Sequence, residues 1–383
     1  MKYQLVAVGS LSKNYVETLE TSLAESMDAL GLDRHQYFEV LNINQREQID
    51  WDGLPVMVWF GGNEISEPED SHLLDYFLKK SLPIFPVVED LSNYPVLVPP
   101  ELHRINGLQW NLERLTTDLL RAFRLCRQQR QAFISYRRLE TRNVAVQLFS
   151  ALSLHGYRVF LDTASVDSGV DFQEALWGRM ADVDLLILLD SPGALSSQWV
   201  YQELVRANDL GLGVLQLIWP GHSRTPGTEF CDPTISLNKT DFVNSQADLN
   251  DYLTDSTVSR VLSAAETARI RSLGLRRMSV VGELVDQAKL VHLDAEVHPV
   301  DGIKLYCGSN VVGCAIPITG LPDALSIQQQ EGLLQLKDLS RTRIIYMGLG
   351  ADPDYTKHLD WLNQKVGLLT CQVDLLDDWL KAL

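Results

Sequence analysis

The sequence predicts an α/β protein built from three successive units. Short apolar runs typical of buried strands alternate with helical patterns, which favours parallel sheets covered by helices. This alternation restarts at Gln131 and again beyond residue 265, and 383 residues are enough for two or three domains. The composition, 45% hydrophobic and 22% charged, is that of a globular protein with a core of ordinary size.

The first unit, residues 1–128, is predicted to alternate strands with helices. Turn residues flank the apolar runs that predict strands, whereas the helical segments carry apolar residues three and four apart. The expected strands are Tyr3–Val8, Pro55–Phe60 and Pro83–Val88, and the expected helices are Asn14–Leu30, Asp70–Lys80 and Leu112–Gln128.

The second unit, residues 129–265, and the third, residues 266–383, repeat this alternation. The second has expected strands at Ala132–Tyr136, Arg158–Leu161, Val183–Leu189 and Gly213–Trp219, and helices at Asn143–Leu154, Phe172–Met180, Gln198–Asp209 and Leu249–Leu273. The third has expected strands at Ile303–Tyr306, Arg343–Met347 and Leu368–Val373, and helices at Val280–Leu293, Pro353–Lys365 and Leu375–Leu383.

The formal net charge of −17 argues against direct nucleic-acid binding and against anionic membranes, because phosphate groups would be repelled. The N-terminal apolar run is too short for a signal peptide, and no apolar stretch approaches the roughly 20 residues that span a bilayer. We therefore expect a cytoplasmic protein without membrane contact. The five cysteines form no Cys/His cluster, so we expect buried free thiols and no metal site.

Four patches follow one another in the second unit. They read FISYRR from Phe133, GYRVFLD from Gly156, SPGAL from Ser191 and WVYQE from Trp199. With these patches, about a third of the chain resembles Toll/interleukin-1 receptor (TIR) domains, and it is most similar to the NAD-hydrolysing kind of bacterial immune proteins and of the animal axon-degeneration NADase. The resemblance implies a flavodoxin-like parallel sheet of the TIR type, flanked here by two further α/β domains.

Glu203 lies where the NAD-cleaving members of that family keep their catalytic glutamate, and Trp199 precedes it by four residues. Residues four apart share one helix face, so both side chains can line one pocket. The nicotinamide–ribose bond breaks through an oxocarbenium-like transition state, which a carboxylate can stabilise while an indole stacks on the leaving ring. The resemblance implies these roles. Without it, Glu203 would be interpreted as a solvated residue near a helix start, and Trp199 as core packing.

Ligands of open parallel sheets bind beyond the carboxyl ends of the strands, where Tyr136, Arg137, Asp162 and Ser191 are expected. The resemblance implies that these residues and Arg138 bind NAD+, and that at least one of the two arginines contacts its pyrophosphate or ribose. The alternatives are surface charges for the arginines and a turn cap for Asp162.

Thr163–Asp171 matches the loop that TIR domains use to contact a neighbouring TIR domain, and in the NADases this loop also helps to complete the adjacent active site. The alternative is an ordinary surface loop. Just before the domain, four arginines recur every three residues and would form a basic stripe on a helix. Such a stripe is either a solvated face or a contact with an acidic partner domain. Its members are Arg121, Arg124, Arg127 and Arg130.

The first unit resembles the second half of a TIR fold in the segments Pro55–Phe60, Pro83–Val88 and Ile105–Trp110. The position of the catalytic glutamate falls near Leu73, so we expect a degenerate domain that binds or assembles; an unrelated α/β domain is the alternative. In the third unit, Gly348 and Gly350 precede a helix start, which could cradle a phosphate. We expect either a structural α/β unit or a regulatory or sensor module there, for a nucleotide signal or a protein trigger.

With the resemblance, the sequence predicts an NAD+ glycohydrolase that yields nicotinamide and ADP-ribose or a cyclic form. NAD+ is then the substrate, and no cofactor is expected. The resemblance implies an antiviral-defence or cell-death effector that is switched on by self-association of TIR domains. Two alternatives stay open: a non-catalytic TIR adaptor that signals by self-association, and an enzyme that makes a cyclic ADP-ribose messenger.

Overall fold

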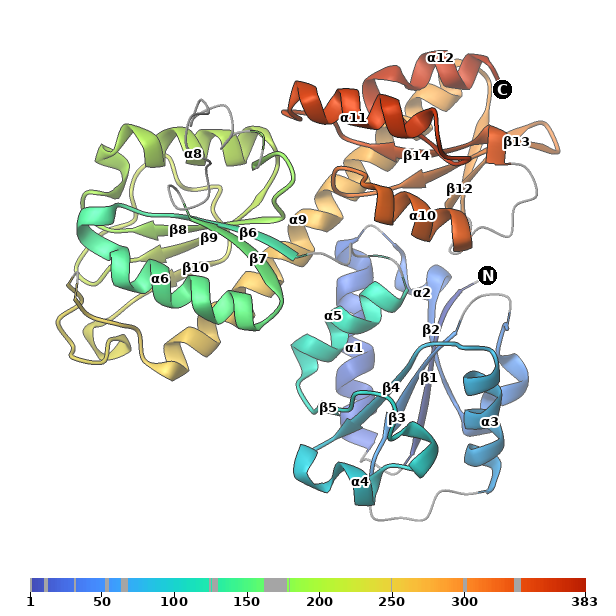
Figure 1. Ribbon diagram of the computed structural model, residues 1–383, viewed down its shortest axis with the longest axis horizontal. Coiled ribbons are helices and arrows are strands. Elements are labelled where there is room, and N and C mark those ends of the chain that lie inside the picture. The colour runs from blue at the N-terminus through green and yellow to red at the C-terminus, as the bar shows by residue number, and fades with distance from the viewer. Residues whose placement is uncertain are drawn as a thin grey trace. The chain divides into compact units, whose positions relative to one another are not determined.

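A computed structural model describes residues 2–9, 13–30, 32–51, 55–62, 68–123, 125, 130–161, 178, 180–248, 250–298, 302–333 and 339–383. The chain divides into two compact units, Met1–Cys126 with Val297–Gly302, and Arg127–Glu296 with Ile303–Leu383. The described residues form three five-stranded sheets, each covered by helices (Figure 1).

The N-terminal sheet is parallel and has the strand order β2-β1-β3-β4-β5. Its central strand β3 is buried along its whole length, as its continuous apolar run predicts. Strand β2 was not predicted, because its residues are only partly buried and lack an apolar run. The strands are β1 Tyr3–Gly9, β2 Phe38–Asn42, β3 Val56–Phe60, β4 Ile84–Val88 and β5 Leu108–Gln109; the helices are α1 Lys13–Ala29, α2 Arg34–Tyr37, α3 Pro68–Lys79, α4 Tyr94–Leu97 and α5 Leu112–Ala122.

The middle sheet has the order β10-β9-β8-β6-β7, and its strands are also parallel. Side chains of helices α6 and α9 form the apolar core on one face, and those of α8 form it on the other. The strands are β6 Arg130–Ser135, β7 Tyr157–Leu161, β8 Leu185–Asp190, β9 Gly213–Ile218 and β10 Thr234–Ser236; the helices are α6 Arg138–Leu154, α8 Gln198–Asp209 and α9 Asp255–Leu290. The predicted helix Phe172–Met180 lies almost wholly outside the described residues.

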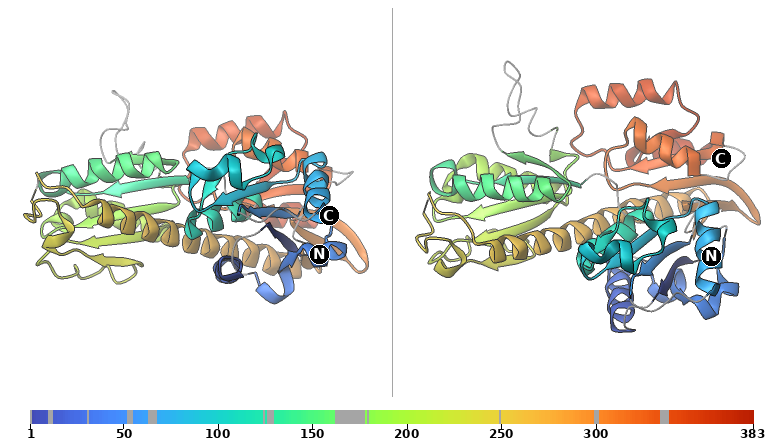
Figure 2. Two further views of the ribbon diagram at one scale, coloured as in Figure 1. Left: turned by 90° about the horizontal axis from the view of Figure 1, so that it is seen from below. Right: turned by 60° about the horizontal axis from the view of Figure 1, so that its bottom comes forward.

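Helix α9 is a single helix of 36 residues, capped at its start by the Thr254 side chain, which accepts a hydrogen bond from the backbone N–H of Thr257 (Figure 2). The prediction of two helices, Leu249–Leu273 and Val280–Leu293, is therefore wrong. Gly274 lies inside this helix, although glycine disfavours a helix interior by about 1 kcal/mol. The glycine is buried inside the helix, and buried residues on either side hold the helix together.

The C-terminal sheet has the order β11-β12-β13-β14-β15. β12 pairs with β13 in an antiparallel hairpin, whereas β13, β14 and β15 are parallel. The sequence did not predict β11, β13 or α10. The elements are β11 Asp294–His298, β12 Gly302–Cys307, β13 Asn310–Pro317, β14 Thr342–Tyr346 and β15 Leu369–Gln372, with helices α10 Ala324–Leu333, α11 Pro353–Asn363 and α12 Leu376–Lys381.

Two further properties concern the described part of the chain. None of its helices combines the length and the apolar character that crossing a membrane requires. Of its cysteines, Cys231 and Cys314 are buried free thiols, as expected, but Cys307 is exposed. The prediction of buried thiols is therefore wrong at Cys307.

Candidate active site

The strand order of the middle sheet creates one switch point, between β6 and β8. From β6 the chain proceeds to one edge of the sheet through β7, and from β8 it proceeds to the other edge through β9. In open α/β sheets the crevice outside the carboxyl ends of such neighbouring strands is the usual ligand site. Ser135 and Asp190 end these two strands, and the loops that follow begin with Tyr136 and Ser191.

Glu203 reaches this switch point from helix α8. Its Oε2 accepts a 2.5 Å hydrogen bond from the Oγ of Ser135, at the carboxyl end of β6. Both side chains are buried: Glu203 is 1% exposed and Ser135 is not exposed at all. A carboxylate is costly to bury unless hydrogen bonds or charges replace its water, and the Ser135 hydroxyl supplies one such bond. The contact fixes the carboxylate beside the strand end where a ligand is expected.

Trp199 and Glu203 lie one turn apart on α8 but differ in environment. Trp199 is 42% exposed, whereas Glu203 is 1% exposed. The helix face that they share is therefore exposed to solvent at Trp199 and buried one turn later at Glu203. Trp199 is not a core residue, which removes core packing as the explanation for its presence. That both residues line one cleft stays a prediction.

Arg137 and Ser191, from the two loops at the switch point, meet at a third residue, Glu140. The Arg137 guanidinium forms an ion pair with Glu140 Oε1. The Ser191 hydroxyl donates a 2.5 Å hydrogen bond to Glu140 Oε2, and the backbone N–H of Gly193 donates to the same oxygen at 3.0 Å. The structure thus brings Arg137 and Ser191 together, as expected for two residues of one site, but around a carboxylate that the sequence analysis had not selected.

This cluster keeps Glu140 ionised. Burial alone raises the pKa of Glu140, but the hydrogen bonds from Ser191 and Gly193 and the Arg137 charge outweigh it, so the pKa lies below its ordinary value. A Cβ at Gly193 would lie 1.7 Å from Arg137 Nη1 and 2.2 Å from Glu140 Oε1, so a larger residue there would displace the ends of these two side chains.

The other three predicted site residues have different settings. Tyr136 is 6% exposed and packs into the apolar core on the α6 and α9 side of the sheet. Arg138 is exposed at the start of α6. Asp162 and the loop Thr163–Asp171 lie outside the described residues. The NAD+-binding roles of these residues stay predictions.

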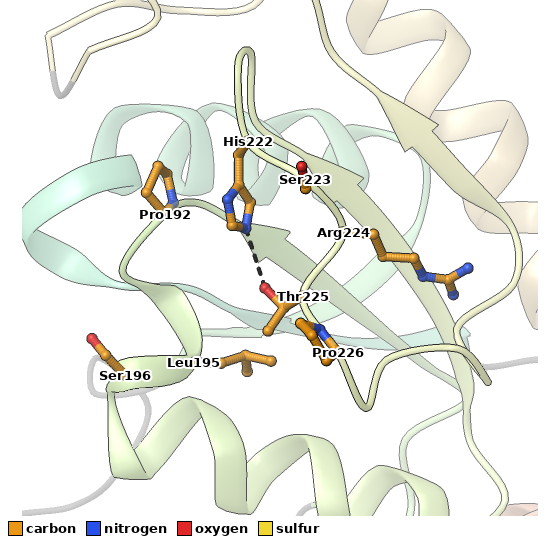
Figure 3. Close-up of a pocket in the computed structure, with 8 residues that line it drawn as sticks. All are labelled: Pro192, Leu195, Ser196, His222, Ser223, Arg224, Thr225 and Pro226. Atoms are coloured by element: carbon orange, nitrogen blue, oxygen red, sulfur yellow. Dashed lines mark hydrogen bonds between the residues drawn. The ribbon is translucent and has the colours of Figure 1, made fainter.

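A cavity of about 540 Å³ opens at the carboxyl ends of β8 and β9 (Figure 3). Pro192, Leu195 and Ser196 form one wall, and residues 222–226 form the other. Asp190, which ends β8, is fully buried and accepts 2.8 Å hydrogen bonds from Gln216 Nε2 and from Oγ1 of the cavity-lining Thr225.

His222 Nε2 lies 3.2 Å from Asp190 Oδ1 and 3.1 Å from Thr225 Oγ1, so this cavity-lining imidazole contacts both residues. Residues 191–196 therefore contribute to both features: Ser191 and Gly193 contact Glu140, and other residues of the segment line the cavity.

Comparison with known proteins decides what this unit is. Residues 132–250 match the family model described as the TIR domain. The chain contains a TIR domain. All four sequence patches lie within the matched segment, and the sheet order is the one expected for the flavodoxin-like TIR fold.

Among solved structures, the chain is similar to a conserved domain protein from Vibrio cholerae O1 biovar El Tor. The identity is 14%, the match covers 90% of this chain and 99% of that one, and the TM-score is 0.20. At that TM-score the similarity says nothing about fold or function.

Two sequence predictions outside the TIR domain can be compared with the structure. Leu73, at the position expected to correspond to the catalytic glutamate in the first unit, is 6% exposed and part of the apolar core. At the start of α11, the Asp352 side chain accepts from the backbone N–H of Asp354, so a carboxylate of the chain itself caps this helix. A phosphate there would meet a negative charge.

The predicted basic stripe is wrong. Helix α5 ends at Ala122, and Arg130 belongs to β6, so the arginines do not share one helix. Arg121 pairs with Asp118 at 2.9 Å, and Arg130 lies 3.8 Å from Glu266, where both side chains are about 10% exposed.

Sequence analysis missed Ser135, Glu140 and the Asp190–His222 pair. Ser135 was inside the first patch but was not singled out, because a serine in a buried strand carries no sign of its partner. Glu140 lies three residues after Arg137, a spacing that usually indicates a surface ion pair. In the described part of the chain, no group of three or more His, Cys, Asp or Glu residues could hold a metal ion.

Proposed function

We propose that this protein is an NAD+ glycohydrolase that cleaves the nicotinamide–ribose bond with Glu203 as the catalytic carboxylate. The observation that carries the proposal is the Ser135–Glu203 hydrogen bond, because it holds a carboxylate at the switch point of a TIR sheet. NAD-cleaving TIR domains, which the sequence resembles, keep their catalytic glutamate at this position.

Cleavage of the nicotinamide–ribose bond requires from the protein mainly a negative charge held next to the ribose. Nicotinamide is already cationic in NAD+ and leaves as a neutral base, so no general acid is needed. Positive charge develops on the ribose, and a carboxylate held beside it stabilises that charge. An exposed indole such as Trp199 can stack on the nicotinamide ring. Water on the anomeric carbon gives ADP-ribose, whereas an internal attack gives a cyclic product.

The burial of Glu203 supports an activation step. A carboxylate that is 1% exposed cannot touch a ribose until the site opens. We propose that self-association of TIR domains opens it, which fits a cytoplasmic defence or cell-death effector that is silent when dispersed. The trigger would act through the C-terminal module, whose α/β sheet is attached to the TIR domain by α9.

A non-catalytic TIR adaptor is the rival function, and the same burial favours it, since Glu203 could be a purely internal hydrogen-bond partner. The test is to incubate the purified full chain with NAD+ and to measure free nicotinamide over a series of protein concentrations, with and without a crowding agent.

We expect nicotinamide release that rises more steeply than protein concentration and that is lost in Glu203→Gln. Chromatography of the products separates ADP-ribose from a cyclic form. An assembled wild-type protein that releases no nicotinamide would establish the adaptor instead.

A further inference from the structure

We propose that Glu140 occupies the diphosphate subsite of the TIR domain as an internal anion, and that this carboxylate must turn out before substrate binds. The inference rests on the proposed function for the identity of the substrate. The occupied subsite itself follows from the contacts around Glu140.

The donors converge as they would on a phosphate. A guanidinium from Arg137, a hydroxyl from Ser191 and a backbone N–H from Gly193 all point at the two oxygens of one carboxylate. Guanidinium groups, hydroxyls and backbone N–H groups are the donors that proteins use for phosphate oxygens. They come from the two strand-end loops that flank the switch point, where a dinucleotide is expected.

Glu140 is also placed so that it can leave. It lies in the first turn of α6, and its side chain is 27% exposed, so rotation about its side-chain bonds takes it into water without crossing the core. Arg137 is 35% exposed and would then present its charge to a ligand.

The carboxylate therefore competes with the ligand. The binding free energy of a ligand is therefore the difference between the free energy of its own contacts and that of the contacts that Glu140 loses. Removing the charge but keeping the shape, as in Glu140→Gln, weakens the competitor, because hydrogen bonds to a charged group are about twice as strong as neutral ones. We expect affinity for a diphosphate to rise about tenfold, within the range of charge-assisted hydrogen bonds.

Isothermal titration of the full chain with inorganic pyrophosphate, and separately with ADP-ribose, tests this. Glu140→Gln should bind both about tenfold more tightly than wild type, and Arg137→Ala in the Glu140→Gln background should lose the gain. Glu229→Gln is the matched control: it removes the same charge from an exposed residue of the same domain and should change nothing.

A folded Glu140→Gln protein that binds pyrophosphate no more tightly than wild type would overturn the proposal. Glu140 would then have only a structural role, connecting the two loops. If this variant is destabilised, Glu140→Asp replaces it. Aspartate keeps the charge but is one methylene too short to keep both Ser191 and Gly193, so tighter binding is again expected and unchanged binding again overturns the idea. Because binding is measured without turnover, an absence of NAD+ cleavage would count only against the proposed function.

Discussion

The hydroxyl of Ser135 donates a 2.5 Å hydrogen bond to Glu203, joining residues that are 68 positions apart in the chain. Ser135 ends strand β6, and Glu203 lies on helix α8, which follows β8 in the chain. Neither position is accessible to solvent. This contact determines where the Glu203 carboxylate lies, beside the carboxyl end of β6.

Ser135→Ala should weaken both the fold and the reaction. The substitution leaves a buried carboxylate without this donor, which costs about 1–3 kcal/mol of unfolding free energy. Nicotinamide release should fall with it, through kcat rather than KM, because the position of the catalytic group changes and not the contacts of the substrate. Urea unfolding and steady-state kinetics measure the two effects.

Ser150→Ala, on the exposed face of α6, is the control and should be neutral in both measurements. Full activity in a stable Ser135→Ala protein would show that the hydroxyl does not position Glu203.

A buried ion-pair cluster fastens α9 to the TIR sheet, and Arg269 is its centre. The fully buried Arg269 lies 3.1 Å from Asp184 and 3.0 Å from Glu266. Arg269→Met should cost about 3–5 kcal/mol, because it removes the cation that lies closest to the buried carboxylates of Asp184 and Glu266. Denaturant unfolding gives the value.

Arg271→Met is the matched control two residues away. Its 2.7 Å pair with Asp232 is exposed, at 54% and 72%. Exposed pairs contribute less than about 1 kcal/mol, so this variant should be close to wild type. Equal losses in the two variants would contradict the role given to burial.

The packing of β9 against α9 depends on Gly213. A Cβ at this position would lie 2.6 Å from the backbone oxygen of Ala268, an atom that cannot move aside as the end of a side chain can. Gly213→Ala should therefore destabilise the protein by about 1–3 kcal/mol.

Gly282→Ala, in the second half of α9, is the counterpart. Nothing lies within 4 Å of its Cβ, so the variant should gain roughly 0.5–1 kcal/mol from helix propensity. Thermal melting compares the two, and opposite shifts of Tm are expected. A Gly213→Ala protein as stable as wild type would mean that the strand and the helix can separate freely.

Asp251 organises the loop before α9 and should make the stability of the protein depend on pH. It is 1% exposed and accepts backbone N–H groups of Asn244, Gln246, Ala247 and Tyr252. Burial raises the pKa of Asp251, but these hydrogen bonds outweigh it, so the pKa lies below its ordinary value. A depressed pKa stabilises the fold above the unfolded value of about 3.9, and this contribution is lost as pH falls through the folded value.

Asp251→Asn should lower Tm by a few degrees at pH 7, and the difference from wild type should shrink as pH falls below about 4. Melting curves across this range measure it, with Asp248→Asn, an exposed residue of the same loop, as control. If the difference in Tm between Asp251→Asn and wild type stayed the same in acid, the charge of the Asp251 carboxylate would not be what organises the loop.

The sequence predicted the α/β class and the helix that carries Glu203, whereas the catalytic role of Glu203 stays a prediction. Apolar runs such as β3 and β8 are buried on both faces, so they are visible as strands in the sequence itself. Glu203 was located by its spacing from Trp199 within a family pattern. Strand β13 escaped prediction because Gly313 interrupts its apolar run; a Cβ there would lie 2.7 Å from the Leu383 side chain.

The contacts that build the site could not be predicted. Ser135 meets Glu203, and Glu140 meets Ser191, only because β6 and β8 are neighbours in the sheet. That adjacency is a property of strand order, which no local pattern encodes. Sequence reasoning therefore selected Glu203, Arg137 and Ser191 as candidates but missed their partners Ser135 and Glu140.

The central claim is that Glu203 stabilises the ribose of NAD+ as nicotinamide leaves. The most direct measurement is kcat for nicotinamide release by wild type and by Glu203→Gln, both assembled and both shown by melting to be folded. Glutamine keeps the size and an acceptor for Ser135 but not the charge. The account predicts a fall in kcat of about 100–1000-fold with little change in KM. A folded Glu203→Gln protein that releases nicotinamide at the wild-type rate would contradict it.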